Sequence, residues 1–270
     1  MKTNKIIGLA AVLTTAAAAI AVACSDAAGP GKAGTFYGPS VSFAQGTARA
    51  WVQTNTAGMP TALGVAMTDQ ALNGLPTTAP GPSPTALMVT LPLPDQAKGH
   101  GFDHAELGWN PNGHEPPQLY GTPHFDLHFY MVSSATQMAI VPSDPQFATK
   151  AANFPAASFI PSGYVPPPGP AANNAVPQMG VHWTDTKSPE LNGQPFTNTF
   201  IYGSWDGQFI FLEPMITRAY LLTHPNATQS IPQPANWAAP GAFPTFYAVA
   251  YDSTTKEYRF TLGGLVQHGN

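Results

Sequence analysis

The sequence predicts an all-β protein, either a sandwich or a jelly-roll-like barrel, with a few short helices and long Pro-rich loops. Short segments that favour strands recur along the chain, and Gly, Pro or Asn bounds each of them. The chain also holds 30 Pro and 25 Gly, which favour turns and loops over long helices. Its 15 Phe, 9 Tyr and 5 Trp supply enough large side chains for a folded core.

The N-terminal segment predicts export. Lys2 and Lys5 stand at the start of the chain, and an apolar, Ala-rich stretch covers residues 6–22. A basic start, a short apolar stretch and small residues at its end are typical of a secretory signal peptide. About 17 apolar residues are at the lower limit for crossing a bilayer, which disfavours a membrane-spanning helix. We therefore expect a lipoprotein signal peptide over residues 1–23.

Cys24 is the only cysteine, and it lies where a bacterial lipoprotein signal places the lipidated residue. A flexible tether of mostly small residues is expected over 24–34. These features predict a membrane-anchored lipoprotein outside the cytoplasm, on the periplasmic or cell-surface side. The alternative is an ordinary signal peptide cut nearby, which would leave a secreted soluble protein. One cysteine cannot form a disulfide within the chain, so stability must come from the core.

The charge balance excludes several classes of partner. Charged residues make up 9% of the chain, and the part after the signal peptide has a formal charge of about −6. That part is not basic enough to favour nucleic acid or an anionic membrane surface. We expect membrane contact through the lipid anchor only, and no nucleic-acid partner. The other expected partners are further copies of the chain, in a homo-oligomer, and an unidentified small-molecule ligand.

Residues 35–270 are expected to form a single β-rich domain, because no internal repeat or change in composition divides them. One helical turn is predicted over 69–75, and a long loop over 95–123 precedes a strand that begins at His124. Four strand-like segments are predicted before that loop, at residues 35–43, 47–54, 61–67 and 86–93.

Two hairpins and two short helices are predicted in the second part of the chain. The hairpins pair residues 198–203 with 208–213 and residues 245–251 with 257–262. The helices cover residues 144–154 and 215–222, and a Pro-rich loop runs over 155–177. The first hairpin carries an Asp-Gly pair between its strands, which is a strong turn signal.

The strand that begins at His124 carries the candidate site. Side chains alternate between the two faces of a strand, so His124, Asp126 and His128 share one face. Phe125 and the other apolar residues of the segment share the opposite face. Packing alone rarely requires such a polar face, whereas metal sites often do.

Imidazole and carboxylate donors suit a divalent ion such as Zn, Mn, Fe or Cu. In an extended strand the Cα atoms of His124 and His128 lie about 13 Å apart, which is wide for one ion. A compact alternative combines one of these histidines with Asp126, His182 and Glu213. The second histidine would then lie outside the donor set, or Asp126 would instead orient a histidine tautomer.

Each candidate also has an interpretation without a metal. The histidine face could line a polar groove or a subunit contact, and Glu213 could be a buried carboxylate paired with Arg218. His100, His104 and His114 fall in the long predicted loop, where we expect a lid over the site.

Three blocks of sequence occur in a fixed order: P-H-F-D-L-H-F-Y at 123–130, M-G-V-H-W at 179–183 and Y-G-S-W-D-G-Q-F-I-F-L-E-P-M at 202–215. Together they resemble a small bacterial family of exported proteins of unknown function, described from a thermophile protein under sigma/anti-sigma control. The resemblance covers residues 85–225 and implies a β-rich, homo-oligomeric protein. The family has no assigned activity, so the resemblance supports the site residues without giving them roles. These residues are His124, Asp126, His128, His182 and Glu213.

Two classes of function fit these observations. The first is an exported, lipid-anchored metal-binding protein with an unassigned activity; in an enzyme, Asp126 or Glu213 would be the candidate general base. The second is a non-enzymatic envelope protein, in which the histidine face serves ligand binding or homo-oligomeric assembly. The sequence has no G-x-S-x-G elbow, P-loop or Rossmann fingerprint, and it does not decide whether the protein is an enzyme.

Overall fold

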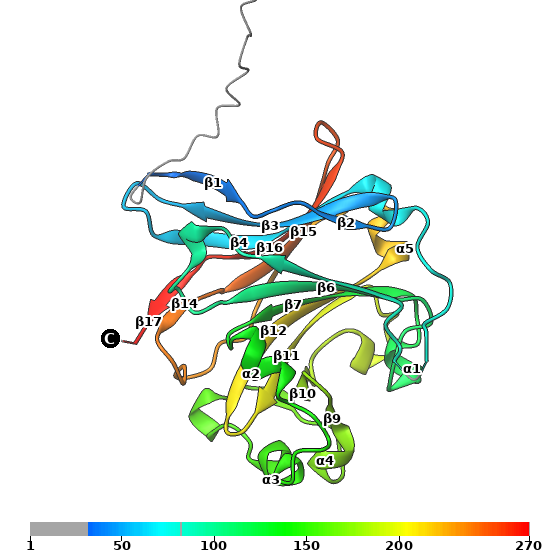
Figure 1. Cartoon of the computed structure of the whole chain (residues 1–270), viewed down its shortest axis with the longest axis vertical. Helices are drawn as coiled ribbons and strands as arrows, with labels where there is room; N and C mark the ends of the chain where they lie inside the picture. Colours follow the sequence, from blue (N-terminus) through cyan, green and yellow to red (C-terminus); the bar gives the residue numbers. More distant parts are fainter. Residues whose placement is uncertain (1–31, 82, 270) are drawn as a thin grey trace, which may run out of the picture.

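Two antiparallel sheets pack face to face in the computed structural model, which describes residues 32–81 and 83–269 (Figure 1). The predicted β-sandwich is confirmed, and the described residues form no closed barrel. The predicted signal peptide over residues 1–23, Cys24 and most of the tether lie outside the described residues. None of the described helices has the length and apolar character needed to cross a membrane.

The first sheet is built from both ends of the chain. Its strands lie in the order β1-β3-β4-β16-β15-β13, and β2 pairs with β3. The pairing of β4 with β16 joins the N-terminal and C-terminal parts at the centre of this sheet. The strands are β1 (Gly34–Tyr37), β2 (Val41–Phe43), β3 (Gly46–Thr54), β4 (Pro60–Thr68), β13 (Asn226–Ser230), β15 (Phe246–Asp252) and β16 (Glu257–Gly263).

The middle of the chain builds the second sheet. Its strands lie in the order β5-β6-β7-β12-β11-β10-β8, and β9 pairs with β10. Strand β7 therefore lies inside the sheet, between β6 and β12. The strands are β5 (Leu87–Pro92), β6 (His104–Asn110), β7 (His124–Tyr130), β8 (Tyr164–Val165), β9 (Ala175–Val176), β10 (Gly180–Asp185), β11 (Asn198–Trp205) and β12 (Gln208–Thr217).

The remaining elements are short. Strands β14 (Gly241–Phe243) and β17 (Val266–His268) form a separate pair. The α-helices are α1 (Pro117–Tyr120), α2 (Ser134–Met138), α3 (Phe147–Ala152), α4 (Ala171–Asn174) and α5 (Arg218–Leu221). Single 3₁₀ turns are η1 (Asp69–Leu72), η2 (Asp95–Ala97), η3 (Ala157–Phe159) and η4 (Glu190–Asn192). Helices α3 and α4 contact each other and pack against β11 and β10.

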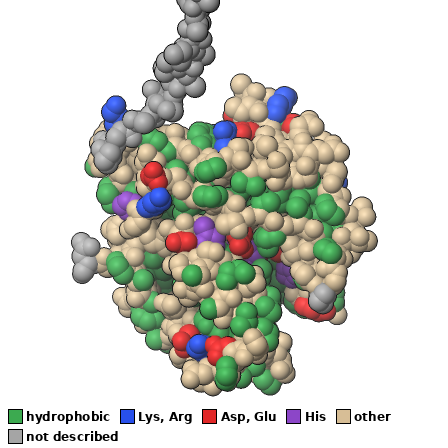
Figure 2. Space-filling model, viewed as in Figure 1, with side chains coloured by type: hydrophobic (Ala, Val, Ile, Leu, Met, Phe, Trp, Pro, Cys, Tyr) green, Lys and Arg blue, Asp and Glu red, His purple; other side chains and the backbone are tan. Residues whose placement is uncertain are grey.

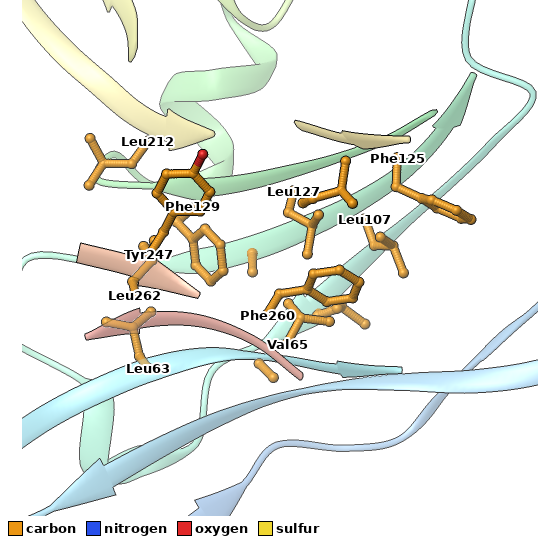
Figure 3. Close-up of a cluster of buried hydrophobic side chains, with 14 of the residues drawn as sticks. Leu63, Val65, Leu107, Phe125, Leu127, Phe129, Leu212, Tyr247, Phe260 and Leu262 are labelled. Carbon is orange, nitrogen blue, oxygen red and sulfur yellow. The ribbon is translucent and has the colours of Figure 1, made fainter. Parts of the chain in front are cut away.

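An apolar core fills the space between the two sheets (Figure 3). The first sheet contributes side chains such as Val65 and Phe260, and the second contributes Leu107 and Leu127, all of them fully buried or nearly so. Burial of a side chain of this size stabilises a fold by roughly 1.5–3 kcal/mol. The core therefore holds one face of β7 in place and leaves the opposite face for the polar residues.

Both predicted hairpins are confirmed. Strands β11 and β12 pair up to Trp205 and Gln208, with Asp206 and Gly207 in the turn. These two turn residues have φ angles of 47° and 86°, the left-handed values that a two-residue type I′ turn requires. Strands β15 and β16 form the second hairpin.

The long loop predicted over 95–123 is wrong between His104 and Asn110, which form the fully buried strand β6. The helix predicted over 215–222 is also too long, because β12 continues to Thr217 and α5 follows it. In both places, pairing with a neighbouring strand decides the conformation. Local turn and helix signals do not reveal such pairing.

Candidate metal centre

The polar face of β7 lies on the side of the second sheet that faces away from the core. The predicted alternation is confirmed, since Phe125 and its apolar neighbours on β7 pack in the core. On the outer face, the register with β6 places Asn110 beside His124 and Glu106 beside His128. This face is nevertheless buried, with His124 and His128 at most 1% exposed.

The first group of possible metal donors consists of His114, His124 and Asp126. One ligand atom from each lies within 4.8 Å of the others. His124 Nε2 is 3.1 Å from Asp126 Oδ1, and His114 Nε2 is 3.7 Å from Asp126 Oδ2. Two of these residues come from β7, and His114 comes from the loop that links β6 to α1.

The loop that carries His114 is held by backbone contacts. The amide of His114 donates to the Tyr120 carbonyl at 3.1 Å, and the amide of Gly113 donates to the Asn110 carbonyl at 3.3 Å. Gly113 has a φ of 68°, and a Cβ atom there would lie 1.9 Å from the Tyr120 oxygen. Only glycine fits this turn, which brings His114 back over the end of β6.

The second group consists of His128, His182 and Glu213, from β7, β10 and β12. His128 Nε2 is 3.4 Å from Glu213 Oε1, and His182 Nε2 is 3.7 Å from Glu213 Oε2. His128 and Glu213 are each 1% exposed, while the His182 side chain is 21% exposed. One side of the second group therefore reaches the surface.

A glycine on the intervening strand β11 makes this second group sterically possible. Gly203 pairs with His182 on one side and with Phe211 on the other. A Cβ atom at Gly203 would lie 2.0 Å from the Phe211 ring. That ring packs edge-on against His128 and His182, with centroids 4.9 and 5.4 Å apart. The aromatic contact shields the donors from one side.

Burial sets the protonation of the second group. It lowers the pKa of His128, and it lowers the pKa of His182 to about 3, with the neighbouring charge of His128 acting in the same direction. Burial and the charge of Asp126 raise the pKa of Glu213 well above its usual value. At neutral pH both imidazoles are therefore neutral, which is the form that binds metal ions.

The first group behaves differently because its members pair with each other. Burial by itself would lower the pKa of His124, but the nearby charge of Asp126 and the hydrogen bond to the Thr122 carbonyl outweigh burial and raise it. Burial would likewise raise the pKa of Asp126, yet His124 and His114 hold it well below its usual range. The Asp126 carboxylate is therefore charged despite its burial.

Several buried donor atoms in the two groups have no hydrogen-bond partner within the described residues. Neither ring nitrogen of His128 has one, nor does Oε2 of Glu213 or Oδ1 of Asp126. Buried polar atoms are nearly always paired, because each unpaired atom costs about 1–3 kcal/mol. A bound cation would supply a partner for one nitrogen of His128 and for the carboxylate oxygens, so the donor set fits a metal.

The structure separates residues that the sequence placed in one compact set. His182 and Glu213 lie with His128, whereas Asp126 lies with His124 and His114. His124 and His128 fall in different groups, in keeping with the wide spacing expected along one strand. Whether these residues bind metal stays a prediction.

Other expectations about individual residues also change. Arg218 donates to the carbonyl of Leu72, so the suggested pairing with Glu213 is absent from the described residues. His104 lies buried in β6, and a paired strand cannot serve as a lid. His100 lies outside both donor groups, and its carbonyl accepts a hydrogen bond from Ala242.

Sequence reasoning missed the contribution of β6 to the polar face. His104 pairs with Asp103 at 2.8 Å and with Gln137 at 2.9 Å, and its ring stacks on Tyr130. Asn110 donates to Asp126 and positions its carboxylate. The alternation of polar and apolar residues in H-A-E-L-G-W-N, at 104–110, is the signal that could have identified this strand.

Histidine and acidic side chains gather across the middle of one face of the molecule (Figure 2). The partly exposed rings of His114 and His182 open the two donor groups to solvent. A cavity of about 290 Å³ lies elsewhere, lined by aromatic residues such as Phe102 and Trp237. Asp103, the partner of His104, is one of its lining residues.

Fold and site together define a β-sandwich protein with two histidine–carboxylate groups on the outer face of one sheet. Residues 55–109 match the model of a family described as TTHB210-like, hypothetical protein TTHB210. The match covers about a fifth of the chain, from the turn before β4 to β6. A comparison with curated proteins and one with solved structures find no match.

The match is consistent with the resemblance to a small family of unknown function. Its position differs from the expectation, because it includes β4 and ends before the first of the three sequence blocks. Control by a sigma/anti-sigma system stays a prediction.

Proposed function

We propose that this protein is an exported, lipid-anchored metal-binding protein, with an ion held by His128, His182 and Glu213. The observation that carries this proposal is the state of His128. Its ring is buried in the second sheet, and neither nitrogen has a hydrogen-bond partner in the described residues. The imidazoles of His128 and His182 and the Glu213 carboxylate surround a common point, and a metal ion there would accept the lone pair of the His128 ring that has no partner.

The donor set favours a divalent transition metal such as Zn, Mn, Fe or Cu. Imidazole nitrogen suits these ions, whereas Mg and Ca prefer oxygen donors throughout. Glu213 would lose its proton when the ion binds, since the ion replaces the proton as its partner. Three protein donors leave coordination positions open, as in catalytic rather than structural zinc sites. The reaction stays unassigned.

The test is elemental analysis of the purified mature protein after incubation with Zn, Mn, Fe or Cu and removal of free ions. We expect stoichiometric metal in the wild type and loss of metal from the second group in His182→Ala. His268→Ala is the matched control, because His268 lies in the separate β14–β17 pair. Metal no higher than trace in the wild type contradicts the proposal and favours a ligand-binding or assembly role for the polar face.

Export and anchoring need their own test, since the segment that carries them lies outside the described residues. The basic start, the apolar stretch and Cys24 support a lipid anchor. We expect the wild type in the membrane fraction and Cys24→Ala in the soluble fraction, with a mass difference equal to the lipid. Wild-type protein without lipid at Cys24 would overturn the anchor and leave the metal site unaffected.

A further inference from the structure

We propose that the protein holds a second divalent transition-metal ion, bound by His114, His124 and Asp126, beside the ion of the second group. This inference rests on the proposed function, because the site of His128, His182 and Glu213 becomes one half of a two-metal centre. The two sites share strand β7, which supplies donors to both.

The imidazoles of His114 and His124 are already oriented for metal binding. His114 donates from Nδ1 to the Glu115 carbonyl at 2.8 Å, and His124 donates from Nδ1 to the Thr122 carbonyl at 2.6 Å. With Nδ1 protonated, Nε2 is the nitrogen of each ring that can bind a metal ion, which takes the place of any proton there. Both Nε2 atoms face Asp126. Metal-binding histidines are typically oriented in this way by a carbonyl or carboxylate partner.

The carboxylate between them has one oxygen held and one oxygen free. Asn110 donates to Oδ2 of Asp126, which fixes the orientation of the group. Oδ1 is buried and has no hydrogen-bond partner among the described residues, although it lies 3.1 Å from His124 Nε2. The Asp126 side chain is 7% exposed. A cation bound by the Asp126 carboxylate and the Nε2 atoms of His114 and His124 would supply the partner that Oδ1 lacks.

The two sites lie next to each other along β7. Asp126 and His128 are alternate residues on the same face, so their Cα atoms are about 7 Å apart. Asp126 belongs to one donor group and His128 to the other. The partly exposed His114 and His182 side chains give each site its own contact with solvent.

An alternative without a second ion is a purely structural network, in which Asn110 and His124 hold Asp126. The two cases differ at His114. A structural network needs no lone pair from His114, whose ring is only partly buried, and its removal would leave the metal content unchanged. In a two-metal centre, removal of His114 eliminates one ion.

The test is zinc stoichiometry, measured on dialysed full-length mature protein after incubation with Zn²⁺ alone. We expect two zinc ions per wild-type chain, one in His114→Ala, one in His182→Ala and none in the double variant. Asp126→Asn, which keeps the side-chain volume, should match His114→Ala, and His268→Ala should retain two ions. Circular dichroism checks that each variant has the wild-type fold.

The outcomes separate this inference from the proposed function. In one outcome the wild type binds one ion, which is lost in His182→Ala and retained in His114→Ala. That result overturns the site of His114, His124 and Asp126 and leaves the proposed function standing. No wild-type zinc overturns both. Adjacency is tested by electron paramagnetic resonance of the Mn²⁺-loaded protein, which should show spin coupling in the wild type and an isolated-ion spectrum in His114→Ala. Two ions without coupling overturn the two-metal centre.

Discussion

The two faces of strand β7 are almost equally buried but differ in how their side chains are satisfied. Phe125, Leu127 and Phe129 have no exposed surface and pack against apolar neighbours from both sheets. His124 and His128, on the other face, are no more than 1% exposed. There, however, several donor atoms lack a hydrogen-bond partner among the described residues.

This difference separates the residues of β7 that stabilise the fold from the residues of β7 that are available to bind a ligand. Apolar burial is favourable by itself, whereas burial of polar atoms without partners opposes folding. A face that retains such atoms weakens the fold, and a bound ligand that supplies the missing partners explains why it is tolerated. Variants on the two faces are therefore expected to change different properties of the protein. Core variants should lose stability, and polar-face variants should lose metal.

The largest effect on stability is expected on the apolar face. Leu127→Ala should lower the free energy of unfolding by about 2–5 kcal/mol, because it leaves a cavity in a fully buried position. Leu222→Ala, at a position 51% exposed, should change it by less than about 0.5 kcal/mol. Denaturant unfolding of the metal-free proteins measures both. A similar decrease in the free energy of unfolding for the two variants would show that packing in the sandwich core does not dominate stability.

Asn110→Ala should weaken zinc binding at the site of His114, His124 and Asp126 by about 10–100-fold, as loss of an orienting partner does in other metal sites. The reason is that Asn110 holds the Asp126 carboxylate in place. The measurement is competitive zinc titration against a chromogenic chelator. Gln137→Ala is the control. It removes a buried amide that forms a hydrogen bond with His104, and neither residue belongs to either donor group. Equal affinities in the two variants would contradict the role of Asn110.

The pH dependence of metal-free protein tests the protonation of His182. Its pKa is about 3 in the folded state, below the usual 6.5, so the unfolded chain takes up a proton first as the pH falls. The contribution of neutral His182 to the free energy of unfolding is therefore complete above pH 6.5. It is lost as the pH falls from about 6.5 to 3, by up to about 1.4 kcal/mol per pH unit.

Denaturant unfolding between pH 7 and 5, in chelator, should show a steeper loss of stability in the wild type than in His182→Ala. His268→Ala should follow the wild type. Parallel curves for wild type and His182→Ala would mean that His182 titrates normally, and that burial leaves its proton affinity unchanged.

The smallest stability effect is expected for Glu213→Gln. Burial and the charge of Asp126 favour the neutral form of Glu213, so a neutral amide of similar size should change the metal-free stability by less than about 1 kcal/mol. The same variant should lose the ion of the second group, because the amide is a poor ligand. Thermal unfolding and zinc analysis measure the two effects, with Glu106→Gln as a nearby control outside both donor groups. A large loss of metal-free stability would show that Glu213 is a structural charge.

Sequence patterns predicted the strands whose signals are local. The Asp-Gly turn identified the β11–β12 hairpin, and alternation along 124–130 identified the two faces of β7. The same alternation in β6 was missed, because neighbouring glycines and prolines made residues 95–123 read as a loop. The grouping of donors was predicted only in part. His182 and Glu213 do lie together, but the participation of His114 depends on a turn at Gly113.

The sequence by itself determined the all-β class, the polar face of β7 and the residue types that can bind a metal, because strand alternation and donor chemistry are local properties. Only the tertiary structure decided that these residues form two groups rather than one. Donors from β7, β10, β12 and a loop meet through sheet order, register and the space left by Gly203. Those relations join residues far apart in the chain, so no spacing along the sequence encodes them.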